Sequence, residues 1–569
     1  MTYFLRQYWF TFIIPSLVSL YSFFLNLAAG PYWLSTNLDP SYAYLLSGLY
    51  LVKGITPGHT DHPGTPLQLL ICIVIGLFNI GRTVPDIVNR VLTTPEFYMH
   101  AVHAVLMLFS FLTSVGLAVY VYEKTKDKTA AILTQIPSLS FLILKSYTSS
   151  DAILPVVANL DPEPLLISII NLFNLCFLKL YFAKEPKEKT IATLGLGFIY
   201  GLGIATKFSC LPLLIIPLIL LPWRMKPLFL AISAGSFIFW TLPILERYPL
   251  LWKWAFNLTT HTGQYANGSQ GVIDLNSFIT NWNTIFLEQW PLVITAVAAL
   301  SLGLWDLLRR KRTQESVFMT VTAMGIILQF ALVAKHPSPH YLVPGIGLFG
   351  VLFLFLYVHL RASTGGMKKI IHGFILIFML TAMTQAFVYR AQLAHMTTDI
   401  LNFHNRVHEK YKGFLFLGYY RSSGQETALA INDAWRKPKG VEEELSRLYP
   451  HFYYFDIFGY AIKDFKQQVW SNDLMSQTPG ILFEGSPFNF SHGPYSVHLL
   501  EQGSHENVYL LTETSEKQAD MLFEEAVQSF EAKDYSKAVS LAMMSRSLNK
   551  NFSTKVENFL RVVILSSRH

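Results

Sequence analysis

The sequence is poor in charged residues and in cysteine. Of its 569 residues, only 14% are charged and 52% are hydrophobic, and the mean hydropathy is +0.35. This composition excludes an ordinary soluble protein of this size and indicates a chain whose solvent is the lipid bilayer. The few cysteines lie within or beside apolar segments without metal-ligand spacing, and we expect them to be small core residues: Cys72, Cys176 and Cys210.

Two further absences bear on the partners of the protein. The sequence has no Gly-rich dinucleotide fingerprint and no nucleotide-phosphate loop. Its net charge of +7 does not indicate nucleic-acid binding, because Lys and Arg gather in the cytoplasmic loops of a membrane protein for topological reasons. We therefore expect membrane lipids, and no nucleic acid, among its partners.

The apolar residues come in runs of roughly 17 to 25, long enough for a helix to cross the hydrocarbon core of a bilayer. The alternation of a membrane β-strand is absent from these runs, and a chain in lipid must satisfy its backbone polar groups internally. The sequence predicts a mainly α, polytopic helical bundle with about eleven spans, near residues 8–29, 98–122, 129–145, 164–183, 190–206, 208–221, 227–244, 290–308, 316–334, 341–360 and 370–389.

Basic clusters set the expected orientation. They fall in alternate connections between the predicted spans, which the positive-inside rule assigns to the cytoplasm: 124–128, 184–189, 224–226, 309–312 and 361–369. The N-terminus is then cytoplasmic. The first apolar run follows Arg6 and lacks a small-residue cleavage site, so we expect a membrane anchor and not a signal peptide. The opposite side receives a long first loop (30–97) and everything after about residue 390.

Two apolar stretches in the first outer loop, 41–53 and 66–80, are shorter or more mixed than a span. We expect them to be helices that lie in the membrane interface. If the second stretch crossed the bilayer, the later loops would exchange sides and the basic clusters would face outward. The positive-inside rule argues against that alternative.

After about residue 390, charged and apolar residues interleave as in a water-soluble domain. We expect strands near 413–420, 451–457, 480–484, 495–500 and 508–512, and helices near 425–436 and 441–448. The sequence therefore predicts three parts. They are a transmembrane domain (1–390), a soluble extracytoplasmic α/β domain (391–514) and a helical hairpin (515–569) that resembles one tetratricopeptide-like unit.

A repeated tetrapeptide marks two candidate catalytic positions. Asn-Leu-Asp-Pro occurs at 37–40 and again at 159–162, each time before an apolar helical run on the outer side. Asp39 and Asp161 can cap these helices, since a carboxylate accepts orphan backbone N–H groups and Pro suits the first helical position. Asp39, Asp161 or Glu163 can instead act as a general base at the membrane surface. One residue can do both, so the two interpretations stay open.

The turn Thr-Asp-His-Pro-Gly-Thr-Pro at 60–66 leads into the second interfacial stretch. Asp61 and His62 in this turn are candidate substrate-binding residues. No second His at ligand spacing accompanies His62, so a metal site is not indicated here. We expect no cofactor, although a divalent metal ion is not excluded by the sequence.

Cations from separate loops gather on the same outer side. They are Arg90 before the second span, Lys207 between two short apolar runs, and Lys335 and His340, followed by Tyr341, in a turn between two spans. Each of these cations, taken alone, is expected to lie at a helix end with its charged group among the lipid headgroups. Together they face the outer carboxylates, as a site requires if it holds an anionic phosphate near a carboxylate base.

In this order and at these topological positions, the motifs resemble those of the GT-C glycosyltransferases, especially the protein mannosyltransferase and lipid A aminoarabinose transferase branch. The resemblance covers roughly residues 1 to 390. Its motifs are Asp39, His62-Pro63, Arg90, Asp161 with Glu163, Gly203 to Lys207, and His340, Tyr341 and Pro344. One departure is Pro40, which follows Asp39 where many relatives have Asp-Glu. It argues against a role that needs two adjacent acids, such as metal binding.

The resemblance implies a GT-C-like fold and an inverting sugar transferase that uses a polyprenyl-phosphate-linked donor at the extracytoplasmic face. Asp39 would take the acceptor proton, and Asp161 and Glu163 are the other candidate acids. The donor phosphate would be bound by Arg90, Lys207, Lys335, His340 and Tyr341. The acceptor, a hydroxyl or phosphate on a lipid, glycan or protein, is left open. Because the outer domain lacks disulfide-capable cysteines, we expect a bacterial plasma (inner) membrane.

Two other classes stay as alternatives. A lipid or solute transporter predicts charges or broken helices within the spans, whereas the predicted span interiors are nearly free of charge. Another polytopic glycan-assembly enzyme, a polymerase or ligase, would share the substrate class and rely on a large late outer loop. The loop at 245–289 is a counterpart with few charges.

Overall fold

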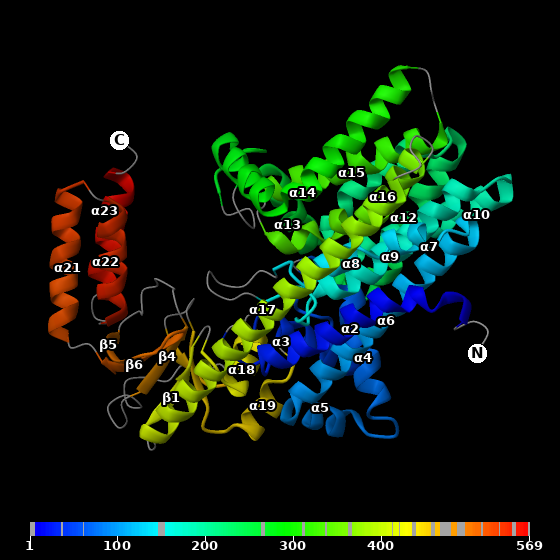
Figure 1. Ribbon diagram of the computed structural model, residues 1–569. Helices are drawn as coiled ribbons and strands as arrows, with labels where there is room; N and C mark the ends of the chain where they lie inside the picture. Colours follow the sequence, from blue (N-terminus) through cyan, green and yellow to red (C-terminus); the bar gives the residue numbers. More distant parts are fainter. Residues whose placement is uncertain are drawn as a thin grey trace. The chain divides into compact units, whose positions relative to one another are not determined.

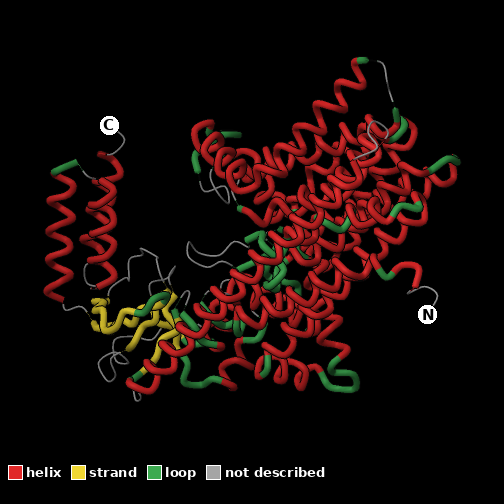
Figure 2. Tube along the Cα trace, viewed as in Figure 1, coloured by secondary structure: helices red, strands yellow, loops and turns green. Residues whose placement is uncertain are grey.

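The fold is predominantly helical, with strands confined to the C-terminal part of the chain (Figures 1 and 2). The computed structural model describes residues 6–35, 38–60, 62–145, 154–262, 268–309, 313–335, 338–361, 367–411, 414–419, 422–434, 440–456, 461–466, 480–485, 495–513, 516–533, 535–548 and 553–566.

Contacts divide the chain into two compact units. The membrane unit comprises Met1–Tyr32, Pro40–His395 and Arg436–Gly440. The C-terminal unit comprises Trp33–Asp39, Met396–Trp435 and Val441–His569. The short segment Trp33–Asp39 therefore belongs to the C-terminal unit, although it lies in the first loop of the sequence.

Nine helical segments of the described chain are long and apolar enough to cross a membrane. The protein is therefore an integral membrane protein. The segments are α2 (Phe10–Ala29), α6 (Pro95–Thr125), α9 (Pro162–Phe182), α10 (Pro186–Thr206), the stretch Trp223–Thr260 with α12 (Lys226–Thr241) and α13 (Tyr248–Thr260), α14 (Leu275–Leu308), α15 (Gln314–Lys335), Pro339–Arg361 with α16 (Val343–Arg361), and α17 (Met367–Lys410).

Two of the predicted spans are broken into short pieces. The stretch 129–145 forms α7 (Lys128–Leu133), α8 (Pro137–Ser140) and turns, and the stretch 208–221 forms η1 (Phe208–Leu214) and α11 (Ile215–Leu220). Proline interrupts each stretch, because its ring removes a backbone donor and clashes with the preceding turn. Counting apolar residues alone therefore gives about eleven spans where the described part of the chain has nine.

The first loop contains three helices, namely α3 (Leu38–Val52), α4 (Thr65–Leu77) and α5 (Val84–Thr93). Helix α4 has 13 residues and is too short to cross a bilayer. It begins after Gly64, whose φ of +64° lies in the left-handed region. A Cβ at Gly64 would also press against the Tyr44 ring. Glycine is therefore required at the N-cap of α4.

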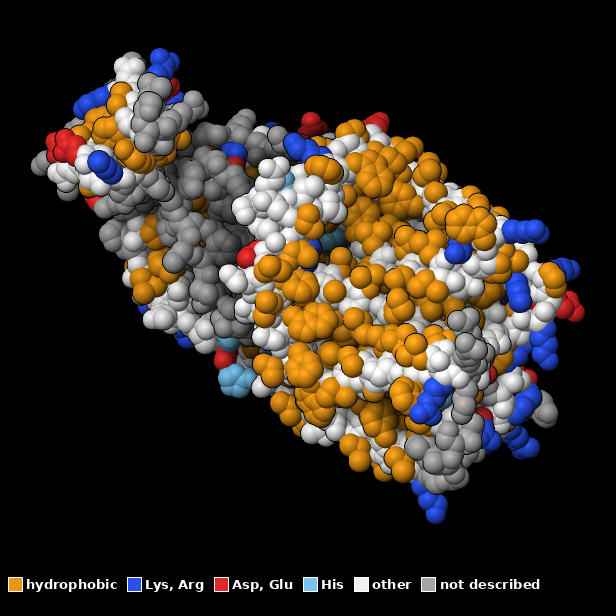
Figure 3. All heavy atoms as spheres, turned by 90° about the horizontal axis from the view of Figure 1, so that it is seen from above, with side chains coloured by type: hydrophobic (Ala, Val, Ile, Leu, Met, Phe, Trp, Pro, Cys, Tyr) orange, Lys and Arg blue, Asp and Glu red, His pale blue; other side chains and the backbone are white. Residues whose placement is uncertain are grey.

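Glycines allow close helix packing in the membrane unit. A Cβ at Gly201 of α10 would overlap the carbonyl oxygen of Ser233 on α12, and one at Gly347 of α16 would overlap Ile170 on α9. Small residues of this kind let helix backbones approach in a membrane, where apolar burial alone does not drive association. Hydrophobic side chains cover much of the described surface of this unit, as expected for contact with lipid, and Lys and Arg gather at one end (Figure 3).

The C-terminal unit has a mixed six-stranded sheet of order β3-β2-β1-β4-β6-β5. Strand β1 pairs in parallel with β2 and β4, and the other pairs are antiparallel. The strands are β1 (Leu415–Gly418), β2 (Tyr453–Asp456), β3 (Ala461–Lys463), β4 (Gly480–Gly485), β5 (Tyr495–Gln502) and β6 (Glu506–Glu513), with helices α18 (Gln425–Ala434) and α19 (Glu442–Leu448). Five strands and both helices lie where the sequence places them, and the three-residue β3 was not predicted.

The chain ends in three helices, α21 (Glu516–Glu531), α22 (Tyr535–Leu548) and α23 (Ser553–Ser566). Phe523, Ala526, Ala542 and Val556 form their buried core. Helices α21 and α22 lie within the range predicted for a helical hairpin (515–569), and α23 adds a third helix. Helix α17 continues through residue 390 to Lys410, so the predicted boundary between the domains lies inside a helix.

Candidate active site

A buried ion pair lies at the centre of the candidate site. Glu163 stands in the first turn of α9 and Lys207 directly follows α10, and the Lys207 ammonium group pairs with Glu163 Oε1. The two residues are 1% and 5% exposed. Desolvating two charges costs several kcal/mol per ion, so each is tolerated there only because the other is present. The structure therefore brings together two residues that are 44 positions apart.

Asp161 caps the helix that carries Glu163. It is the N-cap of α9, and its Oδ1 accepts a hydrogen bond of 3.2 Å from the Glu163 backbone N–H. Asn159 reaches Asp161 Oδ2 at 3.4 Å and accepts a 2.7 Å hydrogen bond from the Ser41 hydroxyl of α3. The capping interpretation of the second Asn-Leu-Asp-Pro copy thus has the expected geometry, and the capped helix end fixes Glu163.

His340 and Tyr341 complete this cluster from the turn before α16. His340 Nε2 lies 3.7 Å from Glu163 Oε1, too far for a hydrogen bond, and its Nδ1 pairs with the Ser338 hydroxyl at 3.0 Å. The Lys207 ammonium group lies 4.9 Å from the centre of the Tyr341 ring, within the range of a cation–π interaction. The ring of Tyr341 therefore lies beside the ion pair.

His62 approaches Tyr341 from the first loop. Its Nε2 lies 3.2 Å from the Tyr341 hydroxyl, and its ring packs edge-on against Trp254 of α13 with centroids 4.7 Å apart. The backbone of His62 has a φ of +42°, which is strained for a residue with a Cβ. Strain of this kind persists only where the surroundings determine it, and it concentrates at functional sites.

Lys335 is the last residue of α15, and its side chain is held by the C-terminal end of α13. Its Nζ donates hydrogen bonds of 2.7 Å to the Leu258 carbonyl and 3.0 Å to the Thr259 carbonyl, both in the last turn of α13. An ammonium group has three N–H donors, so these bonds leave one for a ligand. Carbonyls at the C-terminus of a helix carry partial negative charge and attract such a cation.

The remaining predicted residues stand apart from the cluster. Arg90 is exposed in the last turn of α5, and none of the contacts described for the cluster involves it. Asp39 lies in the first turn of α3, but its side chain falls outside the described residues, as does the whole of Asp61. Their roles stay predictions.

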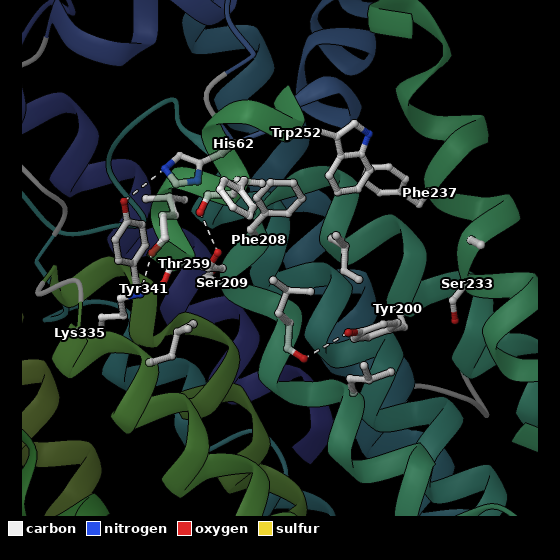
Figure 4. A pocket seen from close by; sticks show the side chains of 18 of the residues that line it. His62, Tyr200, Phe208, Ser209, Ser233, Phe237, Trp252, Thr259, Lys335 and Tyr341 are labelled. Carbon is white, nitrogen blue, oxygen red and sulfur yellow. Dashed lines mark hydrogen bonds between the residues drawn. The ribbon is translucent and has the colours of Figure 1, made fainter. Parts of the chain in front are cut away.

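A large cavity lies beside the cluster. It has a volume of about 850 Å³, within the usual range for ligand pockets. Its walls come from α10, η1, α12, α13 and α15 and are mostly apolar, and they include His62, Lys335 and Tyr341. Figure 4 shows these three residues together at one side of the cavity, with Tyr200 and Ser233 at the other. The cavity is thus mostly apolar, with His62 and Lys335 together at one side.

Sequence reasoning missed the aromatic wall of this cavity. Phe208, Phe237, Trp252 and Phe256 line it. Trp252 and Phe256 lie in the predicted loop at 245–289, and Phe208 lies in the predicted span 208–221, which the structure divides into η1 and α11. The few charges of that loop gave no signal for a site. Its dense aromatic and apolar content was the available signal, since ligand pockets are lined mainly by such side chains.

In the described part of the chain, no group of three or more His, Cys, Asp or Glu side chains is placed to hold a metal ion.

Neither a protein-family model nor a characterised protein matches the sequence. Among solved structures, the chain is similar to ArnT from Cupriavidus metallidurans bound to undecaprenyl phosphate. The two are 13% identical with a TM-score of 0.44, and the match covers 88% of this chain and 97% of that one. At this level the comparison assigns no activity and no residue role to the present chain.

Proposed function

We propose that the protein is a GT-C type membrane glycosyltransferase. It would transfer a sugar from a polyprenyl-phosphate-linked donor to a hydroxyl or phosphate of an acceptor, with inversion at the anomeric carbon. The reaction would take place at the extracytoplasmic face of a bacterial plasma membrane. The acceptor is a lipid, a glycan or a protein.

The observation that carries this proposal is the apolar cavity with Lys335 in its wall. An apolar space of about 850 Å³ within a membrane protein suits a hydrocarbon chain. A cation at one end suits an anionic group attached to that chain. A prenyl phosphate has both features, whereas a water-soluble nucleotide sugar has no apolar tail for such a cavity.

The proposed reaction requires a base for the acceptor proton and a cation for the phosphate leaving group. The acceptor oxygen forms a bond to the anomeric carbon, and Asp39 takes its proton as general base. The bond between the anomeric carbon and the phosphate oxygen breaks, and polyprenyl phosphate leaves with the electron pair. Lys335, with His62 and Tyr341 beside it, would neutralise the charge that develops on this phosphate.

The ion pair has a different task in this proposal. Because Lys207 is already neutralised by Glu163, it is less suited to hold the donor phosphate than Lys335. Its contact with the Tyr341 ring supports the wall of the site instead. The pair would thus hold Tyr341 and, through the hydroxyl of Tyr341, His62 in place.

Binding of undecaprenyl phosphate to the purified protein tests the proposal. We expect binding of this probe and much weaker binding of undecaprenol, which lacks the phosphate. Lys335→Ala should weaken binding of the phosphate about 10- to 100-fold, the equivalent of 1.5 to 3 kcal/mol for a charge-assisted hydrogen bond. It should leave the binding of undecaprenol unchanged.

A pair of tryptophan substitutions tests the cavity itself. Ala255 lines the cavity, so Ala255→Trp should fill part of it and weaken binding of both probes. Ala298 is exposed on α14, away from the cavity lining, and Ala298→Trp is the matched control. Equal binding by wild type and Ala255→Trp, or equal affinity for the two probes, would contradict the proposal.

A further inference from the structure

One buried hydroxyl in the cavity wall has no hydrogen-bond partner in the described part of the chain. It belongs to Ser209, the second residue of η1, which is 6% exposed and lines the cavity. A buried hydroxyl is costly in free energy unless it is hydrogen-bonded. The Ser209 hydroxyl is therefore suited to bond a group that enters the cavity from outside the protein.

The local backbone explains why Ser209 differs from other buried hydroxyls of the membrane unit. Within a helix, a Ser or Thr hydroxyl can donate to the carbonyl of the preceding turn, as Thr206 does to Leu202 at 2.8 Å. Helix α10 ends at Thr206, and the next residue, Lys207, is extended with φ −162° and ψ 135°. Ser209 therefore has no regular helical turn before it that would offer its hydroxyl a carbonyl.

Neighbouring residues place Ser209 on the side of the cavity that carries the polar groups. The Phe208 ring stacks with Trp254 at a centroid distance of 6.1 Å, and Trp254 also packs against His62. Figure 4 shows Ser209 on the same side of the cavity as Lys335. The hydroxyl thus lies where the anionic end of a lipid ligand is expected.

An anionic group in this position needs more than one hydrogen-bond donor. A phosphate carries several acceptor oxygens, and leaving them unbonded in an apolar space is costly. Lys335 has one N–H left after its bonds to the Leu258 and Thr259 carbonyls. A second donor on the same side of the cavity would share the charge of the phosphate with Lys335.

We propose that the Ser209 hydroxyl donates a hydrogen bond to the phosphate of the lipid-linked donor. This inference rests on the proposed function. The hydroxyl is already withdrawn from solvent in the empty cavity, so little further desolvation of this group opposes the new bond. Ser209 therefore contributes to the preference for a prenyl phosphate over a prenyl alcohol of the same length.

The test measures binding of undecaprenyl phosphate and undecaprenol to the purified full-length protein. Ser209→Ala should weaken binding of the phosphate about 10- to 100-fold, because a hydrogen bond to a charged group is lost. Binding of undecaprenol should stay unchanged. In an SDS titration of the empty protein, the midpoint should be unchanged or higher, because the variant removes a buried hydroxyl without a partner among the described residues.

Ser168 on α9 provides the matched control. It is 3% exposed, its Oγ likewise has no hydrogen-bond partner within the described ranges, and it does not line the cavity. Ser168→Ala should therefore leave the affinity for both probes unchanged. The comparison separates the removal of a hydroxyl in the cavity wall from the removal of one elsewhere in the membrane unit.

Unchanged binding of undecaprenyl phosphate by Ser209→Ala would overturn the inference, as would an equal loss of affinity for the two probes. A lower SDS midpoint would also overturn it, because the hydroxyl would then stabilise the fold itself. In each case, a wild-type protein that prefers undecaprenyl phosphate to undecaprenol leaves the proposed function standing. A wild-type protein without this preference refutes the proposed function, and the inference falls with it.

Discussion

The buried pair of Glu163 and Lys207 gives the sharpest test of the site. Glu163→Gln keeps the volume of the side chain and removes its charge, so the Lys207 ammonium group would be left without a carboxylate at 5% exposure. Breaking a buried pair from one side costs about 3 to 5 kcal/mol. The Tyr341 ring lies 4.9 Å from the Lys207 ammonium group in the intact site, so its cation–π contribution is common to wild type and variant and does not offset this cost. A loss of stability of roughly 3 to 5 kcal/mol is therefore expected.

Removing both charges should cost less than removing one. Lys207→Met alone strands Glu163, whereas Glu163→Gln together with Lys207→Met leaves neither charge buried. The double variant should therefore recover most of the stability that each single variant loses, a coupling of at least about 1 to 3 kcal/mol between neighbours. The assay is the equilibrium between folded and SDS-unfolded protein in mixed micelles.

An exposed ion pair provides the control for this comparison of single and double variants. Glu123 pairs with Lys126 at a surface position, and Glu123→Gln should leave the SDS midpoint nearly unchanged. If the effects of Glu163→Gln and Lys207→Met simply add in the double variant, the two side chains are not an energetically coupled pair. That result would refute the central electrostatic feature of the site.

Further predictions concern topology, packing and pH. A reporter fused after Arg312 should indicate the cytoplasm and one after Lys412 the outer side, and matching signals from the two would refute the orientation. Gly201→Ala should destabilise the membrane unit by about 1 to 3 kcal/mol through overlap with α12. Gly235→Ala on α12, where a Cβ meets open space, should be neutral or stabilising by up to about 1 kcal/mol in the same SDS titration. Burial raises the pKa of Glu506, so the folded state holds this proton more tightly than the unfolded state does. The stability of the C-terminal unit should therefore fall as pH rises above about 4.3, and Glu506→Gln should abolish that part of the pH dependence in urea titrations.

The sequence predicted most helices and strands because their patterns are local. Five of the six strands of the C-terminal sheet lie within a few residues of the predicted ranges. The three residues of β3 are too few to show a period, and only pairing with β2 defines that strand. The predicted spans at 129–145 and 208–221 failed because hydropathy does not register the proline breaks within them.

The candidate site was predicted less completely, since its defining contacts are tertiary. The sequence placed Glu163, Lys207 and His340 on one side of the membrane, and the structure brings them together. It could not show that Lys207 pairs with Glu163, because the pairing depends on how α9 and α10 pack. Nor could it show that Trp33 and Ser35 belong to the C-terminal unit, because no local pattern connects residues so distant in sequence.

The most direct test of the central claim compares the glycolipids and glycoproteins of three strains by mass spectrometry. One strain lacks the gene, one carries the wild type, and one carries Asp39→Asn. Asn keeps the size of Asp but cannot accept the acceptor proton, so transfer should fall by roughly 10² to 10⁴-fold at normal protein level. The account predicts that the deletion and Asp39→Asn strains accumulate a sugar-loaded polyprenyl phosphate and lack one sugar on the same product. Identical glycans and donor lipids in all three strains would contradict it.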